Sequence, residues 1–259
     1  MIRLIVSDLD GTLMPYGSSA PSREALALIE ELEARSVELV ISTGRTYGEL
    51  CAIPSLSAPT RTVICCDGAC CYANGRTVYE RSIASEDLSK FFQAARRSGG
   101  FILHGREVNY GFGALPSDAA RFSPVSVRSV FDLREPIFKV TAYGMELSTP
   151  PTGLRMHWDG GAFSSSQWVN RFANKGTALS DLLVRRMLTP FDVACLGDSG
   201  NDLPMMRGVK LSVCVGDRSP ELAYACLHHV SSVEEALTFL LEDARDARDA
   251  CHFSFKKEK

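Results

Sequence analysis

Apolar runs and helix-like spacings alternate along the first part of the chain. Residues 3–7 form a short apolar run that predicts a buried strand, and residues 22–35 place apolar side chains at helical spacing behind a Pro-Ser start signal. Residues 37–42 and 62–66 have the composition of two further buried strands. Strand, helix and strand in repetition are typical of a parallel sheet with helices on its faces, so we expect an α/β fold.

The pattern changes in the middle of the chain and later returns. A helix is predicted over residues 85–98, and the strand-like segments that follow it, separated by Pro, Gly and Thr turns, indicate a small antiparallel sheet. The first pattern then resumes with a helix at 175–187, strands at 193–197 and 211–215, and helices at 220–226 and 233–250. We therefore expect a parallel α/β core from residues 1–82 and 170–259, with a small α+β module inserted at 83–169.

Composition and charge exclude several functional classes. Of the 259 residues, 45% are hydrophobic and 23% charged, which is ordinary for a globular protein with a real core. The formal net charge of -3 provides no basic field for nucleic acid or for a membrane surface. No apolar run approaches the roughly 20 residues that span a bilayer, and the N-terminus has no signal-peptide pattern. We expect a cytoplasmic protein; no oligomeric state follows from the sequence.

Nine cysteines, an odd number, favour reduced thiols in such a compartment. Four of them cluster in the segment ICCDGACCY, as Cys65, Cys66, Cys70 and Cys71. Their spacing differs from the CxxC pairs that wrap a zinc ion. We interpret them as small hydrophobic residues on two short strands around an Asp-Gly turn, and keep a zinc or redox role as a weaker hypothesis.

Polar clusters follow three of the predicted strands, where ligands of open α/β sheets bind. These are DLDGT at residues 8–12, STGR at 42–45 and GDSGND at 197–202, and Lys175 opens the helix before the last of them. Several carboxylates without His or Cys nearby suit Mg²⁺ rather than zinc. Lysine, hydroxyls and glycine-flanked amides suit a phosphoryl group. Two aspartates one residue apart can serve as nucleophile and general acid/base around one cation.

In this order, DLDGTL, STGR, NKGTAL and GDSGNDLPM resemble the four motifs of the haloacid dehalogenase superfamily. With a large insert after the third strand, the chain resembles the Cof-type phosphatases of that superfamily. The resemblance implies a Rossmann-like core with an inserted C2-type cap. It also implies that Mg²⁺ is the cofactor.

The resemblance assigns roles to particular residues. Asp8 would be the nucleophile and a metal ligand, and Asp10 the general acid/base, with its backbone carbonyl on the metal. Lys175 would neutralise the phosphate and orient Asp8. Asp198 would be the second carboxylate ligand of Mg²⁺, and Asp202 a further acidic residue at the metal. Asn201 and Asp202 would also hold phosphate, water or Lys175. Thr43, with Ser42 as the fallback, would bind the phosphate together with Gly44 and Arg45.

The sequence departs from the family pattern at Asp67, where relatives usually have asparagine. Polar residues of the inserted module are further candidates for reading the leaving group: His104, Arg106, Asn109, Tyr110, His157 and Trp158.

We expect a Mg²⁺-dependent phosphomonoester hydrolase that acts on a small phosphorylated metabolite, with a sugar phosphate favoured, through an aspartyl-phosphate intermediate. Two alternatives stay open. One is a phosphomutase of similar architecture, as in the phosphomannomutases, and the other is a non-catalytic metabolite-binding module.

Overall fold

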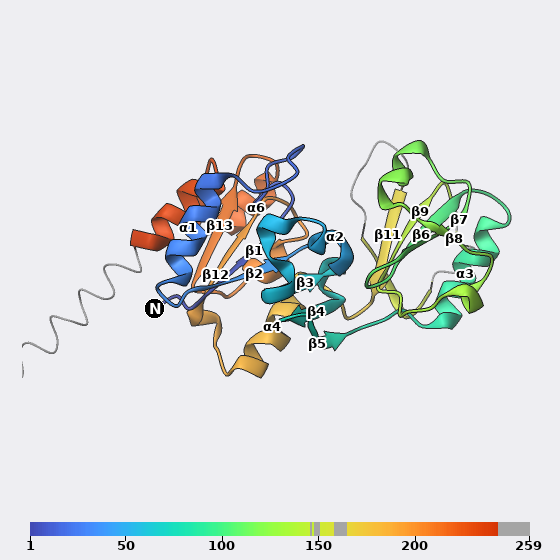
Figure 1. Ribbon diagram of the computed structural model, residues 1–259, viewed down its shortest axis with the longest axis horizontal. Coiled ribbons are helices and arrows are strands. Elements are labelled where there is room, and N and C mark those ends of the chain that lie inside the picture. The colour runs from blue at the N-terminus through green and yellow to red at the C-terminus, as the bar shows by residue number, and fades with distance from the viewer. Residues whose placement is uncertain (146, 148–150, 158–164, 243–259) are drawn as a thin grey trace, which may run out of the picture.

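The computed structural model describes residues 1–145, 147, 151–157 and 165–242 of the chain. Two β-sheets organise these residues and lie side by side (Figure 1). The larger sheet has eight strands in the order β14-β13-β12-β1-β2-β3-β4-β5. Their bounds are β1 (Leu4–Ser7), β2 (Glu38–Ser42), β3 (Thr62–Cys65), β4 (Cys70–Ala73), β5 (Arg76–Glu80), β12 (Val193–Gly197), β13 (Leu211–Val215) and β14 (His228–Val230). The strands from β14 to β3 are parallel, and β4 and β5 are added antiparallel.

Helices cover both faces of this sheet, because its strands point apolar side chains alternately to the two sides. In β1, Ile5 joins the cluster beneath α1 (Arg23–Glu33) and the helical residues 233–242, whereas Leu4 and Val6 join the cluster on the opposite face. That opposite face is covered by α4 (Lys175–Arg186), α5 (Leu203–Met206) and α6 (Pro220–Ala225). The short helix α2 (Tyr47–Cys51) follows β2. The core is therefore a three-layer α/β/α arrangement.

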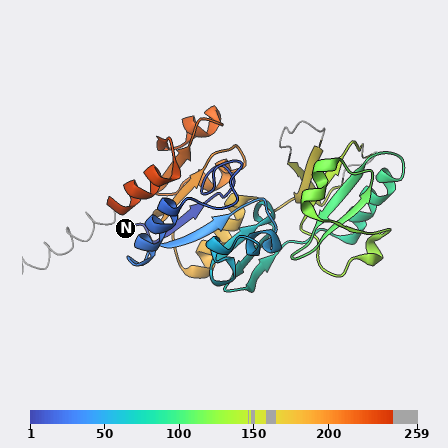
Figure 2. The same cartoon turned by 45° about the horizontal axis from the view of Figure 1, so that its top comes forward.

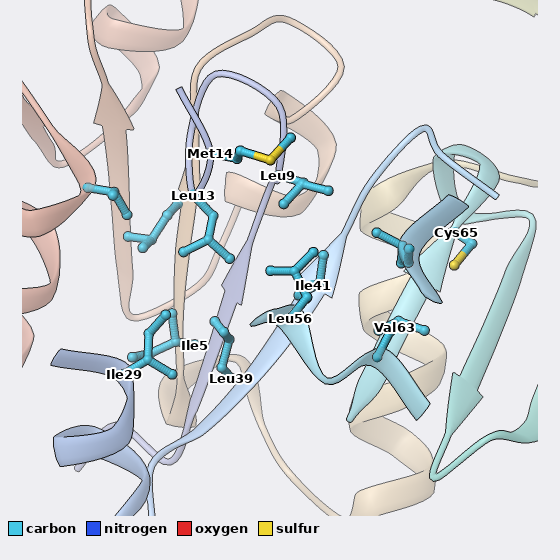
Figure 3. Packing of buried hydrophobic residues seen from close by; sticks show 14 of the residues in the cluster. Ile5, Leu9, Leu13, Met14, Ile29, Leu39, Ile41, Leu56, Val63 and Cys65 are labelled. Carbon is cyan, nitrogen blue, oxygen red and sulfur yellow. The ribbon is translucent and has the colours of Figure 1, made fainter. Parts of the chain in front are cut away.

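The chain that leaves β1 is held in place by apolar anchors. Leu9, Leu13 and Met14 are almost fully buried in the same cluster as Ile5 (Figure 3). The backbone N–H of Met14 donates to the carbonyl of Leu9 at 2.8 Å, which folds the loop back on itself. Because Leu9 points into the core, its neighbours on either side, Asp8 and Asp10, are fixed at the end of the strand.

The second sheet belongs to the inserted segment, which we call the cap. Its six strands lie in the order β10-β11-β9-β6-β7-β8. Their bounds are β6 (Gly100–His104), β7 (Asn109–Gly113), β8 (Val125–Ser126), β9 (Lys139–Tyr143), β10 (Leu154–His157) and β11 (Ser165–Asn170). The helix α3 (Ser85–Ala95) packs on one face through a cluster of aromatic side chains that includes Phe91, Phe92 and Phe101. Two chain segments join the cap to the core (Figure 2).

These observations confirm the predicted fold class, a parallel-sheet core with a small α+β cap. Most predicted strands end within a residue or two of the observed ones, and β12 and β13 have the predicted bounds. The helix expected at 233–250 is helical over 233–242, and its remainder lies outside the described residues. Several short elements were not predicted: α2, α5, β5, β8 and β14.

Within the described residues, short 3-10 helices lie in the connections, at Pro54–Leu56, Ala58–Thr60, Cys66–Gly68, Ser117–Phe122, Val130–Asp132 and Pro190–Asp192. In the part of the chain that the structure describes, no helix is both long and apolar enough to cross a bilayer.

Candidate active site

The sheet topology brings together acidic residues that lie far apart in the sequence. β1 and β12 are adjacent parallel strands, so Asp8 and Asp198, which follow them, meet at the same sheet edge. Lys175 opens α4 and reaches into this edge, with its Nζ 2.5 Å from Asp8 Oδ1 and 2.6 Å from Asp202 Oδ1. The lysine side chain is only 1% exposed. The structure thus assembles the carboxylates around one buried ammonium.

This arrangement carries excess negative charge. Asp8, Asp198 and Asp202 bring carboxylate oxygens within 4.8 Å of one another, against the single positive charge of Lys175. Burial raises the pKa of Asp8 well above its usual value, Lys175 opposes the rise, and Asp202 adds to it. Burial also raises the pKa of Asp198, against a hydrogen bond from Tyr16. Burial alone would lower the pKa of Lys175, but Asp202 and Asp8 raise it above the usual value.

The charge surplus and the donor chemistry fit a divalent cation. With all three carboxylates ionised, two negative charges remain after Lys175 is counted, which equals the charge of Mg²⁺. The donors are carboxylate oxygens, the ligands that hard cations prefer. Among the described residues, these three aspartates are the group of His, Cys, Asp or Glu side chains whose possible ligand atoms all lie within 4.8 Å of one another.

Asp202 differs from the other two aspartates in its surroundings. Its Oδ2 accepts hydrogen bonds from the backbone N–H groups of Asp198 and Ser199, both at 3.1 Å, while Oδ1 accepts from Lys175. Its side chain is fully buried. A carboxylate held in this way fixes the loop after β12 and positions Lys175, and it has less freedom to bind a cation than Asp8 or Asp198.

Tyr16 is a site residue that the sequence did not reveal. Its hydroxyl donates to Asp198 Oδ2 at 2.8 Å, and its ring lies beneath the Arg218 guanidinium, 4.5 Å from the ring centroid. Gly11 makes this contact sterically feasible, because a Cβ there would lie 2.3 Å from the Tyr16 ring. Gly11 also has a φ of +93°, which favours glycine. The motif DLDGT contains the glycine, but nothing in the sequence pairs Tyr16 with Asp198.

Asp10 lies next to this cluster, but its side chain faces another partner. Arg45 donates to both of its oxygens, from Nε at 2.8 Å and from Nη2 at 2.5 Å. The pair is partly exposed to solvent. The hydrogen bonds from Arg45 to Asp10 raise the pKa of Arg45. The carboxylate of Asp10 is therefore held in a partly exposed position by a bidentate contact.

The two hydroxyls predicted to bind phosphate differ in their contacts. The Oγ1 of Thr43 accepts from the backbone N–H of Arg45 at 3.2 Å, at the turn after β2. The Oγ of Ser42 is buried and has no hydrogen-bond partner among the described residues. Gly44 packs against Asp67: a Cβ added at Gly44 would lie 3.1 Å from the Oδ1 of Asp67. Asn201 also reaches Asp67, with Nδ2 3.4 Å from Oδ1.

The polar cap residues suggested as candidates for contacting the leaving group have different surroundings. Arg106 contacts the core away from the aspartates: it donates to the carbonyl of Gly75 at 3.0 Å and lies over the rings of Tyr72 and Tyr47. Tyr110 is buried in the cap. The side chains of His157 and Trp158 lie outside the described residues.

His104 is buried on the cap-sheet face opposite α3, between two hydrogen-bond partners. The amide N–H of Asn109 donates to the carbonyl of Phe122, so the Oδ1 of Asn109 faces His104 Nδ1, at 2.9 Å. Because Oδ1 can only accept, the proton of the imidazole is assigned to Nδ1. Nε2 then accepts from the Thr141 hydroxyl at 2.9 Å. Burial, reinforced by the charge of Lys139, lowers the pKa of His104 from 6.5 to about 3. The imidazole is therefore neutral in the folded cap.

We expect this histidine to make the cap sensitive to acid. The unfolded chain binds a proton near pH 6.5 and the folded cap only near pH 3, so unfolding takes up a proton between these values and stability falls as the pH falls. We expect the free energy of unfolding to be about 2 kcal/mol lower at pH 5 than at pH 7. Urea unfolding at pH 7 and pH 5 checks this: His104→Gln should lose much of the pH dependence, and His229→Gln, at an exposed histidine, should keep it. Equal dependence in all three proteins would contradict the assignment.

The four clustered cysteines are packing residues in this structure. All four are at most 1% exposed, and Cys65 pairs with Cys70 across the antiparallel strands β3 and β4. A hydrogen bond with Cys70 and burial raise the pKa of Cys66 well above its usual value, and burial does the same for Cys70. Such thiols are poor nucleophiles. In the described chain they do not join a group of three ligands close enough for one metal ion.

The sequence of this chain matches a known protein family. A family model described as haloacid dehalogenase-like hydrolase matches residues 5–119 and 158–236. A phosphoglycolate phosphatase of Methanoculleus marisnigri is 26% identical over 216 residues, which cover 83% of this chain and 84% of the relative.

Solved structures share the fold at lower sequence identity. A phosphatase of the same superfamily from Bacteroides thetaiotaomicron has a TM-score of 0.78 and 22% identity, and the match covers 92% of this chain and 95% of the other. A sugar phosphatase of subclass IIB has a TM-score of 0.77 and 14% identity, with 92% and 98% covered. These likenesses confirm a core and cap of the predicted kind.

Proposed function

Because this chain belongs to the haloacid dehalogenase-like hydrolases, we propose that it is a Mg²⁺-dependent phosphatase of a small phosphorylated metabolite, with a sugar phosphate favoured. One observation carries the proposal: Lys175 is buried between Asp8 and Asp202, with Asp198 beside them, at the carboxyl ends of adjacent parallel strands. The expected division into a core of residues 1–82 and 170–259 and a cap of residues 83–169 is part of the same proposal.

In this proposal Asp8 is the nucleophile. A carboxylate oxygen of Asp8 attacks phosphorus in line with the leaving oxygen, and the bond from phosphorus to that oxygen breaks to give an aspartyl phosphate. The contact of 2.5 Å from Lys175 orients the carboxylate and supplies positive charge beside the phosphoryl oxygens. Tyr16 keeps Asp198 in place through its hydrogen bond.

Asp10 is proposed to move the protons. In its protonated form, the carboxyl group of Asp10 gives its proton to the leaving oxygen. The resulting carboxylate then takes a proton from the water that attacks the aspartyl phosphate, so that inorganic phosphate leaves and both Asp8 and the protonated Asp10 are restored. Arg45 donates hydrogen bonds to both oxygens of Asp10. A substrate phosphate would compete with Asp10 for this guanidinium, which would free the carboxyl group for proton transfer. Thr43 or Ser42, with Gly44 and Asn201, would complete the phosphate site.

The proposed ligands of the cation are Asp8, Asp198 and the backbone carbonyl of Asp10, with Asp202 as an acidic neighbour. When bound, Mg²⁺ would neutralise the surplus of carboxylate charge and the negative charge of the phosphoryl group. The eight cysteines of the described residues are free thiols, which supports the proposal of a reducing, cytoplasmic compartment.

A phosphate-release assay tests the proposal. The purified protein is given sugar phosphates, phosphoglycolate, nucleotides and an aryl phosphate, each with Mg²⁺ and with a chelator. We expect release that requires Mg²⁺ and returns when excess Mg²⁺ is added after chelation. Conversion of a sugar phosphate to its isomer without free phosphate would favour the phosphomutase. Folded protein that binds these compounds without turnover would favour the binding module.

A further inference from the structure

One buried ion pair joins the cap to the core. Lys139 begins the cap strand β9, and Asp67 lies in the turn after the core strand β3. The Nζ of Lys139 is 2.9 Å from Asp67 Oδ2 and 3.3 Å from the carbonyl oxygen of Gly44. The two residues are only 7% and 3% exposed. Lys139 is therefore a charged cap residue enclosed against the core.

The pair borders the proposed phosphate site. Gly44 directly follows Thr43, and a Cβ at Gly44 would lie 3.3 Å from Lys139 Nζ. On the other side, the amide of Asn201, in the loop between Asp198 and Asp202, is 3.4 Å from Asp67 Oδ1. Both neighbours of the pair thus belong to loops that would surround the phosphoryl group. The next part of a bound substrate, its leaving group, would lie between these loops and the cap.

One N–H group of the Lys139 ammonium has no acceptor in the part of the chain that the structure describes, and it is available to a ligand. An ammonium carries three N–H groups. Among the described residues, Lys139 has two acceptors, Asp67 and the Gly44 carbonyl. A buried donor without an acceptor costs free energy, so an oxygen atom brought in by a substrate would be stabilised there.

The charge of Asp67 determines whether Lys139 favours a hydroxyl or a carboxylate oxygen of the substrate. Burial alone would lower the pKa of Lys139, but the Asp67 carboxylate raises it above its usual value, so the ammonium stays charged. Together the two side chains are neutral. A hydroxyl that accepts from Lys139 leaves this buried pair neutral. A carboxylate would also be attracted by Lys139, but the charge of Lys139 is already balanced by Asp67, so the carboxylate would lose its hydration and add an uncompensated negative charge beside Asp67.

We propose that Lys139 and Asp67 determine substrate specificity: Lys139 binds a hydroxyl of the leaving group, and Asp67 disfavours leaving groups that carry a carboxylate. This inference rests on the proposed phosphatase activity and makes it more specific. It assigns polyol or sugar phosphates as the substrate class, in preference to phosphorylated carboxylic acids such as phosphoglycolate.

Two substrates of equal length test the inference. Glycerol 3-phosphate and 3-phosphoglycerate differ in that a hydroxymethyl group of the first is a carboxylate in the second. We expect kcat/KM of the wild-type protein to be at least about tenfold higher for glycerol 3-phosphate. Asp67→Asn should reduce this ratio about tenfold by improving the use of phosphoglycerate. Asparagine tolerates the left-handed backbone at this position, where φ is +55°, so the variant should fold.

Lys139→Met should raise KM for glycerol 3-phosphate more than it lowers kcat, because a binding contact is lost. Lys90→Met is the matched control, since Lys90 pairs with Asp87 elsewhere in the cap, and it should leave the substrate ratio unchanged. A wild-type preference for phosphoglycerate, or an unchanged ratio in Asp67→Asn, would overturn the inference while aryl phosphate hydrolysis upheld the phosphatase. No release from any substrate, the aryl phosphate included, would overturn both.

Discussion

Asp8→Asn is expected to abolish phosphate release without unfolding the protein. The asparagine has nearly the same shape but cannot form an acyl phosphate, so we expect kcat to fall on the order of 10⁴-fold or more. Stability should be unchanged or higher, since burial disfavours the charge of Asp8 and the substitution reduces the carboxylate surplus around Lys175. Lys175 keeps its contact of 2.6 Å with Asp202 in the variant.

Single-turnover phosphate release and thermal unfolding, measured on the same preparation, check both parts. Asp217→Asn is a suitable control, because this carboxylate is 94% exposed and lies 3.2 Å from the ring of the surface residue His229. It should retain wild-type activity. If Asp8→Asn kept more than about one hundredth of the wild-type rate, Asp8 would not be the nucleophile.

Much of the fold could be predicted because its strands are continuous apolar runs. Val193–Gly197 and Leu211–Val215 lie inside the parallel sheet, almost every residue is buried, and their bounds are those predicted. β5 was missed for the opposite reason. Its sequence RTVYE lies at a sheet edge with exposed and half-buried residues, so hydrophobicity gave no signal. The short helix α2 was also missed, although Thr46 and Glu49 form a capping box at its start.

In the candidate site, residues that directly follow a strand could be predicted, whereas contacts between residues far apart in the sequence could not. Asp8, Asp10 and Asp198 could be proposed from the sequence because each follows a recognisable strand, and parallel strands bring their ends together. Tyr16 could not, since its contact with Asp198 depends on how the loop after Asp10 turns. The Asp67–Lys139 pair joins residues 72 positions apart, one in the turn after the core strand β3 and the other on the cap strand β9. The unusual aspartate at position 67 was visible in the sequence, but its partner was not.

The second large effect is expected for Lys175→Met, and it concerns stability as well as activity. Lys175 is the cation buried between Asp8 and Asp202, with contacts of 2.5 Å and 2.6 Å. Removing one partner of a buried ion pair leaves the other charge uncompensated, at a cost of about 3–5 kcal/mol. Here three carboxylates would remain together. We therefore expect the free energy of unfolding, measured with urea in the presence of a chelator, to fall by about this amount.

Magnesium should restore part of this loss, because a cation that binds only the folded state stabilises it and would neutralise the same carboxylates. The double variant Lys175→Met/Asp202→Asn should recover stability in chelator, since it removes one of the crowded charges together with the lysine. Lys90→Met, which breaks a partly exposed pair, should change stability by no more than about 0.5–1 kcal/mol. If Lys175→Met were as stable as Lys90→Met in chelator, the buried lysine would not be what holds these aspartates together, and the charge argument for a divalent cation would lose its basis.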